Sequence, residues 1–196
     1  MTISCFGTGS APVPASCRGR VGPAAGPGTL LHMTTPNDVL RSMFEHHLWA
    51  TEGLIEHLMK LPSERLDEAV PGTYGSMIDT LTHLIDADAR YLQRFETPAL
   101  ASSDDRTGVP LETLRDEMPE HRRRWGELLD RLERGELHAS VIGKEGYPNT
   151  DPAESLLSIQ AIHHGNDHRT QICSTLGALG EEVPELDGWS YWATGR

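Results

Sequence analysis

The segment AIHHGNDHRTQI, residues 161–172, concentrates histidines in a way that suits metal binding. His164 and His168 are four residues apart, so on a helix they are separated by about 40° around the axis and by about one turn along it. Both imidazoles can then reach one ion, which is the geometric reason for this spacing in helical zinc sites. His163 points about a quarter turn away and is a weaker candidate ligand.

On a helical wheel, this histidine pair faces inward at the border between core and solvent. An apolar stripe is formed by Leu157, Ala161, Ile172, Leu176 and Leu179. His168 lies within this stripe, and His164 lies along its edge with Gln171. A metal on one imidazole nitrogen and a hydrogen-bond acceptor on the other would satisfy a buried ring. Two histidines at this spacing are more often ordinary hydrogen-bonded or surface residues, so a metal site needs a third ligand.

A candidate third ligand, His83, lies in the segment SMIDTLTHLIDADARYL, residues 76–92. His83 is off the apolar stripe of that segment and shares a polar flank with Asp79, Asp86 and Arg90. Asp79 and Asp86 are each close enough in helical spacing to hold the second nitrogen of His83. Both carboxylates could equally be ordinary helix-surface groups, and the flank by itself is also compatible with a solvated helix face.

Four long stretches carry apolar residues at three- and four-residue spacing, which is typical of amphipathic helices. They span residues 36–60, 76–95, 111–136 and 151–180. Ser76 is a good N-cap for the second stretch, with Asp79 three residues further on. Four such helices joined by polar connections predict an all-α protein with the architecture of a four-helix bundle.

The parts of the chain outside these stretches are expected to add little to the core. Residues 1–32 are rich in Gly, Pro, Ala and Ser, so we expect a low-complexity, disordered N-terminal extension. The domain then spans residues 33–196, and 37% hydrophobic content in a chain of 196 residues suits a single core. Residues 181–196 are rich in Trp, and we expect a mostly irregular tail that packs over an end of the bundle.

Charge and motif content exclude several classes of function. The 17 basic and 29 acidic residues give a net charge of -12, which would repel nucleic acid and anionic lipid surfaces. No apolar stretch is long enough to cross a bilayer, and the N-terminus lacks the pattern of a secretion signal, so we expect a cytoplasmic protein without a membrane partner. A glycine-rich phosphate loop, a Gly-x-Ser-x-Gly elbow and a CxxC pair are all missing, which leaves the histidines as the chemical lead.

The two histidine segments, taken in order with FEHHLWAT in the first helical stretch, resemble the DinB-like superfamily of four-helix bundles. The resemblance covers nearly all of residues 33–180. It rests on Thr80, Leu81, His83 and Leu84, and then on His164, His168, Arg169 and Gln171. It implies a divalent metal ion, commonly zinc or nickel, bound by His83, His164 and His168. The chain departs from the family pattern at His163 and Thr51, where the family usually has asparagine.

The resemblance also implies a class of chemistry. Three imidazoles leave a zinc or nickel ion with open positions, where water or a thiol becomes nucleophilic near neutral pH. We therefore expect a metal-dependent enzyme of the thiol-dependent S-transferase or hydrolase type, acting on a small-molecule substrate. The co-substrate would be a low-molecular-weight thiol such as mycothiol or bacillithiol. A non-catalytic protein that binds a metal or small ligand is the alternative, and a homodimer is expected in either case.

Two further residues are candidates for catalytic roles. His46 lies where some relatives carry a polar residue near the site, and it could orient metal-bound water. The other interpretation is that His46 or its neighbour His47 is a hydrogen-bonded residue of a helix interface. Asp79 is the second candidate, through the second nitrogen of His83.

Overall fold

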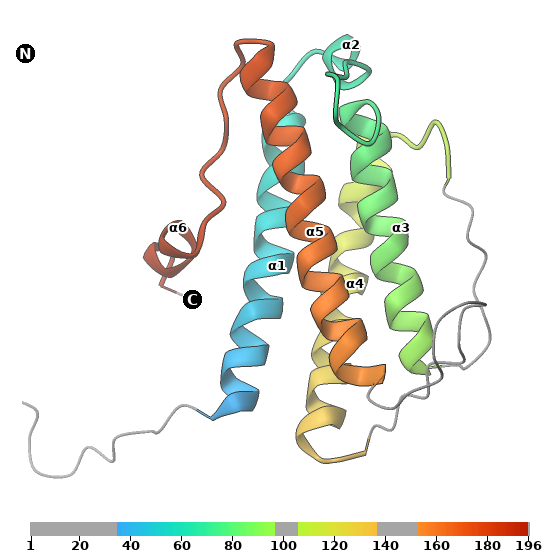
Figure 1. Cartoon of the computed structure of the whole chain (residues 1–196), viewed down its shortest axis with the longest axis vertical. Coiled ribbons are helices and arrows are strands. Elements are labelled where there is room, and N and C mark those ends of the chain that lie inside the picture. Colours follow the sequence, from blue (N-terminus) through green and yellow to red (C-terminus); the bar gives the residue numbers. More distant parts are fainter. Residues whose placement is uncertain (1–34, 97–105, 137–152, 196) are drawn as a thin grey trace, which may run out of the picture. The chain divides into compact units, whose positions relative to one another are not determined.

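The computed structural model describes residues 35–96, 106–136 and 153–195, and within these ranges the chain is helical without strands (Figure 1). The prediction of an all-α protein is therefore confirmed. The predicted N-terminal extension, residues 1–32, lies outside the described residues. The helices are α1 (Pro36–Leu58), α2 (Ser63–Leu66), α3 (Met77–Glu96), α4 (Leu111–Glu133), α5 (Ala153–Ala178) and α6 (Gly188–Ala193).

Local sequence signals fix where the long helices begin. At the start of α1, the Thr35 side chain accepts a hydrogen bond from the Asp38 amide at 3.2 Å, and Asp38 Oδ2 accepts one from the Thr35 amide at 2.6 Å. This reciprocal pair satisfies amides that the first helical turn leaves unpaired. At α3, Ser76 Oγ accepts from the Asp79 amide at 3.2 Å, as the sequence predicted for this helix start.

The long helices pack around one apolar core. Helix α1 packs against α4 and α5, and α3 packs against the same two helices. Trp125 of α4 is fully buried, and its ring centroid lies 4.3 Å from that of Phe44 in α1. This aromatic pair packs at the contact between α1 and α4. The α3–α5 contact is the most extensive of the set, and it carries the three histidines identified above. No helix within the described ranges is long and apolar enough to cross a membrane.

The C-terminal segment departs from the expectation of a tail over the end of the bundle. A left-handed Gly180 (φ 76°) ends the α5 region, and the Glu181 amide closes the turn on the Leu176 carbonyl at 3.0 Å. The following residues run back along α1, where Leu186 and Tyr191 lie beside His46. The expected position over a bundle end was wrong because backbone carbonyls of this segment find partners along the side of α1. The short helices α2 and α6 were also not predicted, since each is too short to show a helical period.

Candidate metal centre

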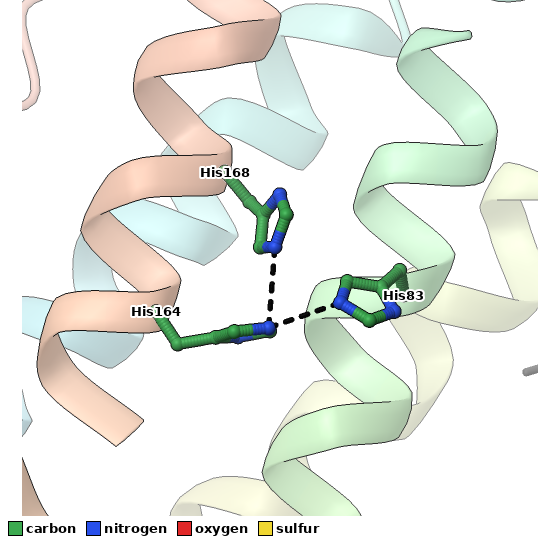
Figure 2. Close-up of side chains that lie close together, drawn as sticks. All are labelled: His83, His164 and His168. Atoms are coloured by element: carbon green, nitrogen blue, oxygen red, sulfur yellow. Dashed lines mark hydrogen bonds between the residues drawn. The ribbon is translucent and has the colours of Figure 1, made fainter. Parts of the chain in front are cut away.

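The α3–α5 contact brings His83, His164 and His168 together, and we call these residues the three-histidine group (Figure 2). His83 projects from α3, and the other two project from successive turns of α5. The Nε2 atom of His164 lies 3.0 Å from Nε2 of His83 and 3.1 Å from Nε2 of His168. The same ring nitrogen of all three residues therefore faces one point between the helices.

The donor set of the three-histidine group fits a divalent ion. A tetrahedral ion with Zn–N distances of about 2.0–2.1 Å separates its ligand nitrogens by about 3.3 Å. The observed separations of 3.0 and 3.1 Å are slightly shorter, so a small outward movement of the rings would admit the ion. Imidazole nitrogens suit zinc, copper, iron and nickel, and a three-nitrogen set leaves coordination positions open.

Two neighbours fix the rings of the three-histidine group. Gln171 Oε1 accepts a hydrogen bond from the Tyr74 amide at 3.0 Å and lies 3.2 Å from Nδ1 of His168. Because Gln171 offers an oxygen, His168 carries its proton on Nδ1 and keeps the Nε2 lone pair for a metal. Tyr74 stacks on His83, with ring centroids 4.1 Å apart and planes 20° apart. The sequence analysis had not singled out Tyr74, although it lies only nine residues before His83.

The electrostatic environment keeps His164 in the neutral form that can bind a cation. Burial, together with the neighbouring His168 and His83, lowers the pKa of His164 from 6.5 to about 4. The His164 imidazole is therefore neutral at pH 7, with a lone pair available on a nitrogen. Metal ligands of this type must be deprotonated before they bind, so the folded chain prepares this residue in advance.

We expect the metal-free protein to lose stability as the pH falls from about 6.5 toward about 4, the two pKa values of His164 in the unfolded and folded chain. Between these values the unfolded chain binds more protons than the folded chain, so protonation favours unfolding. Chelator-treated protein unfolded in urea at several pH values would measure this slope. His164→Gln should flatten it, while substitution of the exposed neighbour, His163→Gln, should not. An unchanged slope in His164→Gln would contradict the expectation.

The two predicted catalytic residues have hydrogen-bond partners outside the three-histidine group. His46 Nε2 lies 2.9 Å from the Leu186 carbonyl, and its ring contacts Trp49 and Tyr191. Asp79 Oδ2 accepts from the Ser76 hydroxyl at 2.6 Å at the start of α3. The catalytic roles of His46 and Asp79 stay predictions.

Asp86, the other carboxylate considered for His83, is engaged with a different partner. Its Oδ1 lies 2.8 Å from Nε of Arg106, and its Oδ2 accepts from the Arg106 amide at 2.9 Å. Asp86 therefore ties the start of the α4 region to α3.

Behind the three-histidine group lies a buried network of His47, Thr51, Asp88 and Arg169, each at most 4% exposed. His47 Nε2 lies 2.8 Å from Asp88 Oδ2, and Arg169 donates to His47 Nδ1 at 3.1 Å. Arg169 also donates to Thr51 Oγ1 at 3.0 Å. Because guanidinium nitrogens only donate, Nδ1 of His47 must accept, and its Nε2–H must donate to Asp88. The network joins α1, α3 and α5.

This buried network was missed in the sequence analysis, although two signals pointed to it. His47 belongs to the apolar stripe of the first helical stretch, with Phe44 three residues before it. Asp88 follows Leu81 by seven residues and Leu84 by four, so it also lies on an apolar face. A charged residue on a buried stripe requires a buried partner.

Opposite charges stabilise the ionised forms of the network. Burial acts to raise the pKa of Asp88, but the hydrogen bond from His47 and the positive charge of Arg169 hold that pKa below its usual value. Burial lowers the pKa of Arg169 to about 10, against the opposing pull of Asp88. Both side chains therefore remain charged at pH 7, with the His47 ring between them.

Comparison with protein-family models matches residues 33–195 to the model described as the DinB family. The match includes every described residue and all three members of the three-histidine group. A search of curated proteins found no match.

Proposed function

Because the chain belongs to the DinB family, we propose that it is a metal-dependent enzyme whose three-histidine group holds a zinc or nickel ion. The convergence of three Nε2 atoms, with His164 held neutral, carries this proposal. The ion would supply Lewis acidity that makes water or a thiol nucleophilic near neutral pH. The substrate would be a small electrophilic molecule.

The chain's own residues would prepare this reaction by orienting the ligands. Gln171 fixes the ring of His168, and Tyr74 covers one face of His83. Tyr74 is 53% exposed, so the side of the three-histidine group that it covers borders solvent. Small molecules can approach the group from this side. The family resemblance supports a thiol such as mycothiol or bacillithiol as the co-substrate, and it also supports a homodimer.

We expect untagged protein to contain near-stoichiometric zinc or nickel, and His164→Ala to contain almost none. Removing one of three ligands eliminates the convergent site, because the remaining two imidazoles hold an ion far more weakly. Elemental mass spectrometry of the purified proteins measures the difference. His163→Ala is the matched control, since His163 is exposed and lies outside the three-histidine group. Wild-type protein that contains no metal and does not bind added zinc or nickel would overturn the proposal.

The catalytic part of the proposal needs its own test. The metal-loaded protein should accelerate the conjugation of a model electrophile with a bacterial thiol, or the hydrolysis of a model ester. A cobalt-substituted protein should also change its visible spectrum when thiol is added, because an open site accepts a further ligand. A spectrum that does not respond, together with no rate enhancement, would favour a non-catalytic metal-binding protein.

A further inference from the structure

Two buried polar atoms behind the metal centre have no hydrogen-bond partner among the described residues: Nδ1 of His164 and Oδ1 of Asp88. Buried polar groups in native proteins are nearly always paired, so each unpaired one needs an explanation. The third such atom, Nε1 of Trp125, lies in the apolar core and is not connected with the site. The first two belong to facing helices, α5 and α3.

The two atoms have complementary chemistry once His164 offers Nε2 to a metal. A neutral imidazole that coordinates through Nε2 carries its proton on Nδ1, which becomes a hydrogen-bond donor. Asp88 is ionised, so its Oδ1 is an acceptor with no proton of its own. Its other oxygen, Oδ2, is already occupied by His47 at 2.8 Å. One donor and one acceptor are therefore left over on opposite sides of the α3–α5 contact.

Several contacts bring Asp88 close to His164. Tyr91, three residues after Asp88, meets the His164 ring edge-on with centroids 5.9 Å apart. The His47 ring that binds Asp88 lies against Gly165, the residue after His164.

We propose that Asp88 is a positioning residue for the metal centre, with Oδ1 accepting the Nδ1–H of His164 directly or across one bridging water. This inference rests on the proposed function, since it concerns the ligand in its metal-binding tautomer. Asp88 then joins the buried network to the three-histidine group through one carboxylate. A carboxylate that holds the second nitrogen of a metal-binding histidine fixes the ring and strengthens its basicity.

Asp88→Asn tests the proposed contact with His164 while keeping the contact with His47. Arg169 forces His47 to donate through Nε2, so the single amide oxygen of Asn is needed by His47. The amide nitrogen would then face His164 and could not accept its proton. We expect the zinc affinity of Asp88→Asn to fall by about 10- to 100-fold, measured by competition with a chromophoric chelator.

Asp86→Asn is the matched control for that measurement. Asp86 is a second buried carboxylate on α3, and its partner is Arg106 rather than a histidine of the centre. The Asp86→Asn variant should have a lower free energy of unfolding, because the substitution weakens the ion pair with Arg106. Its zinc affinity should equal that of the wild type.

A second measurement requires no substitution. In zinc-loaded wild-type protein with ¹⁵N-labelled histidine, the Nδ1 proton of His164 should be visible by NMR and protected from solvent exchange. Exchange at the rate of a free imidazole would overturn the inference even if Asp88→Asn fails to fold. Equal zinc affinities of wild type and Asp88→Asn would overturn this inference alone. A wild type that binds no zinc would overturn the proposed function and this inference together.

Discussion

Replacing Arg169 by methionine is expected to destabilise the fold by about 3–5 kcal/mol, the range for removing one partner of a buried charge pair. Arg169 is 4% exposed and donates to His47 and Thr51 within α1. Methionine fills much of the same volume but supplies neither charge nor donors. Asp88 would then remain buried without its cationic partner, and His47 Nδ1 would lose its hydrogen bond. Urea unfolding followed by circular dichroism measures the free energy of unfolding.

The control for this prediction is Arg123→Met on the outer face of α4. Arg123 is paired with Glu120 and Glu127, but its side chain is 53% exposed. Exposed ion pairs contribute little, so the change should stay within about 0.5 kcal/mol. Equal losses in Arg169→Met and Arg123→Met would show that the buried network does not hold the helices together.

Gly165→Ala is expected to destabilise the protein by about 3 kcal/mol, although alanine is usually the better helix former. A Cβ atom at position 165 would lie 2.6 Å from His47 Nδ1 and nearer still to its Cε1. The His47 ring cannot move aside cheaply, because Asp88 and Arg169 hold its two nitrogens. The substitution must therefore push α5 away from α1 or break the buried network. Thermal and urea unfolding both report the loss.

Gly126→Ala, also within a long helix, is expected to stabilise the protein. A Cβ atom at residue 126 of α4 meets nothing within 4 Å. The ordinary gain in helix propensity, about 0.5–1 kcal/mol, should then appear as increased stability. A stabilising effect of Gly165→Ala as well would mean that His47 does not pack against α5 as described.

The long helices follow closely from the sequence. The predicted stretch 36–60 corresponds to α1 (Pro36–Leu58), and 111–136 corresponds to α4 (Leu111–Glu133). Periodic burial and capping are local properties, so neighbouring residues are enough to reveal them. The short helix α6 was not predicted because six residues are fewer than two helical turns and show no clear period. Its place beside α1 depends on contacts across more than 140 positions of the chain.

The adjacent residues His46 and His47 show the limit of reading the sequence alone. They differ by about 100° around α1. The structure turns His47 into the core, where it is 1% exposed, and turns His46 toward the Leu186 carbonyl. The alternative that one of the two is a hydrogen-bonded residue of a helix interface is confirmed for His47. The apolar stripe of the helix places His47 on the core side, but its partners there belong to α3 and α5 and depend on how those helices pack against α1.

The sequence by itself determined the helices and the pairing of His164 with His168, because four residues of an α-helix return a side chain to nearly the same face. The sequence offered His83 as a candidate third ligand, but only the resemblance to a family assigned it to the same metal as this pair. Tertiary structure alone decided that His83 meets the pair across 81 positions, and that His47, Asp88 and Arg169 form one buried network. These contacts depend on how three helices are rotated and shifted against one another. That arrangement is set by the packing of the entire core, and no local pattern encodes it.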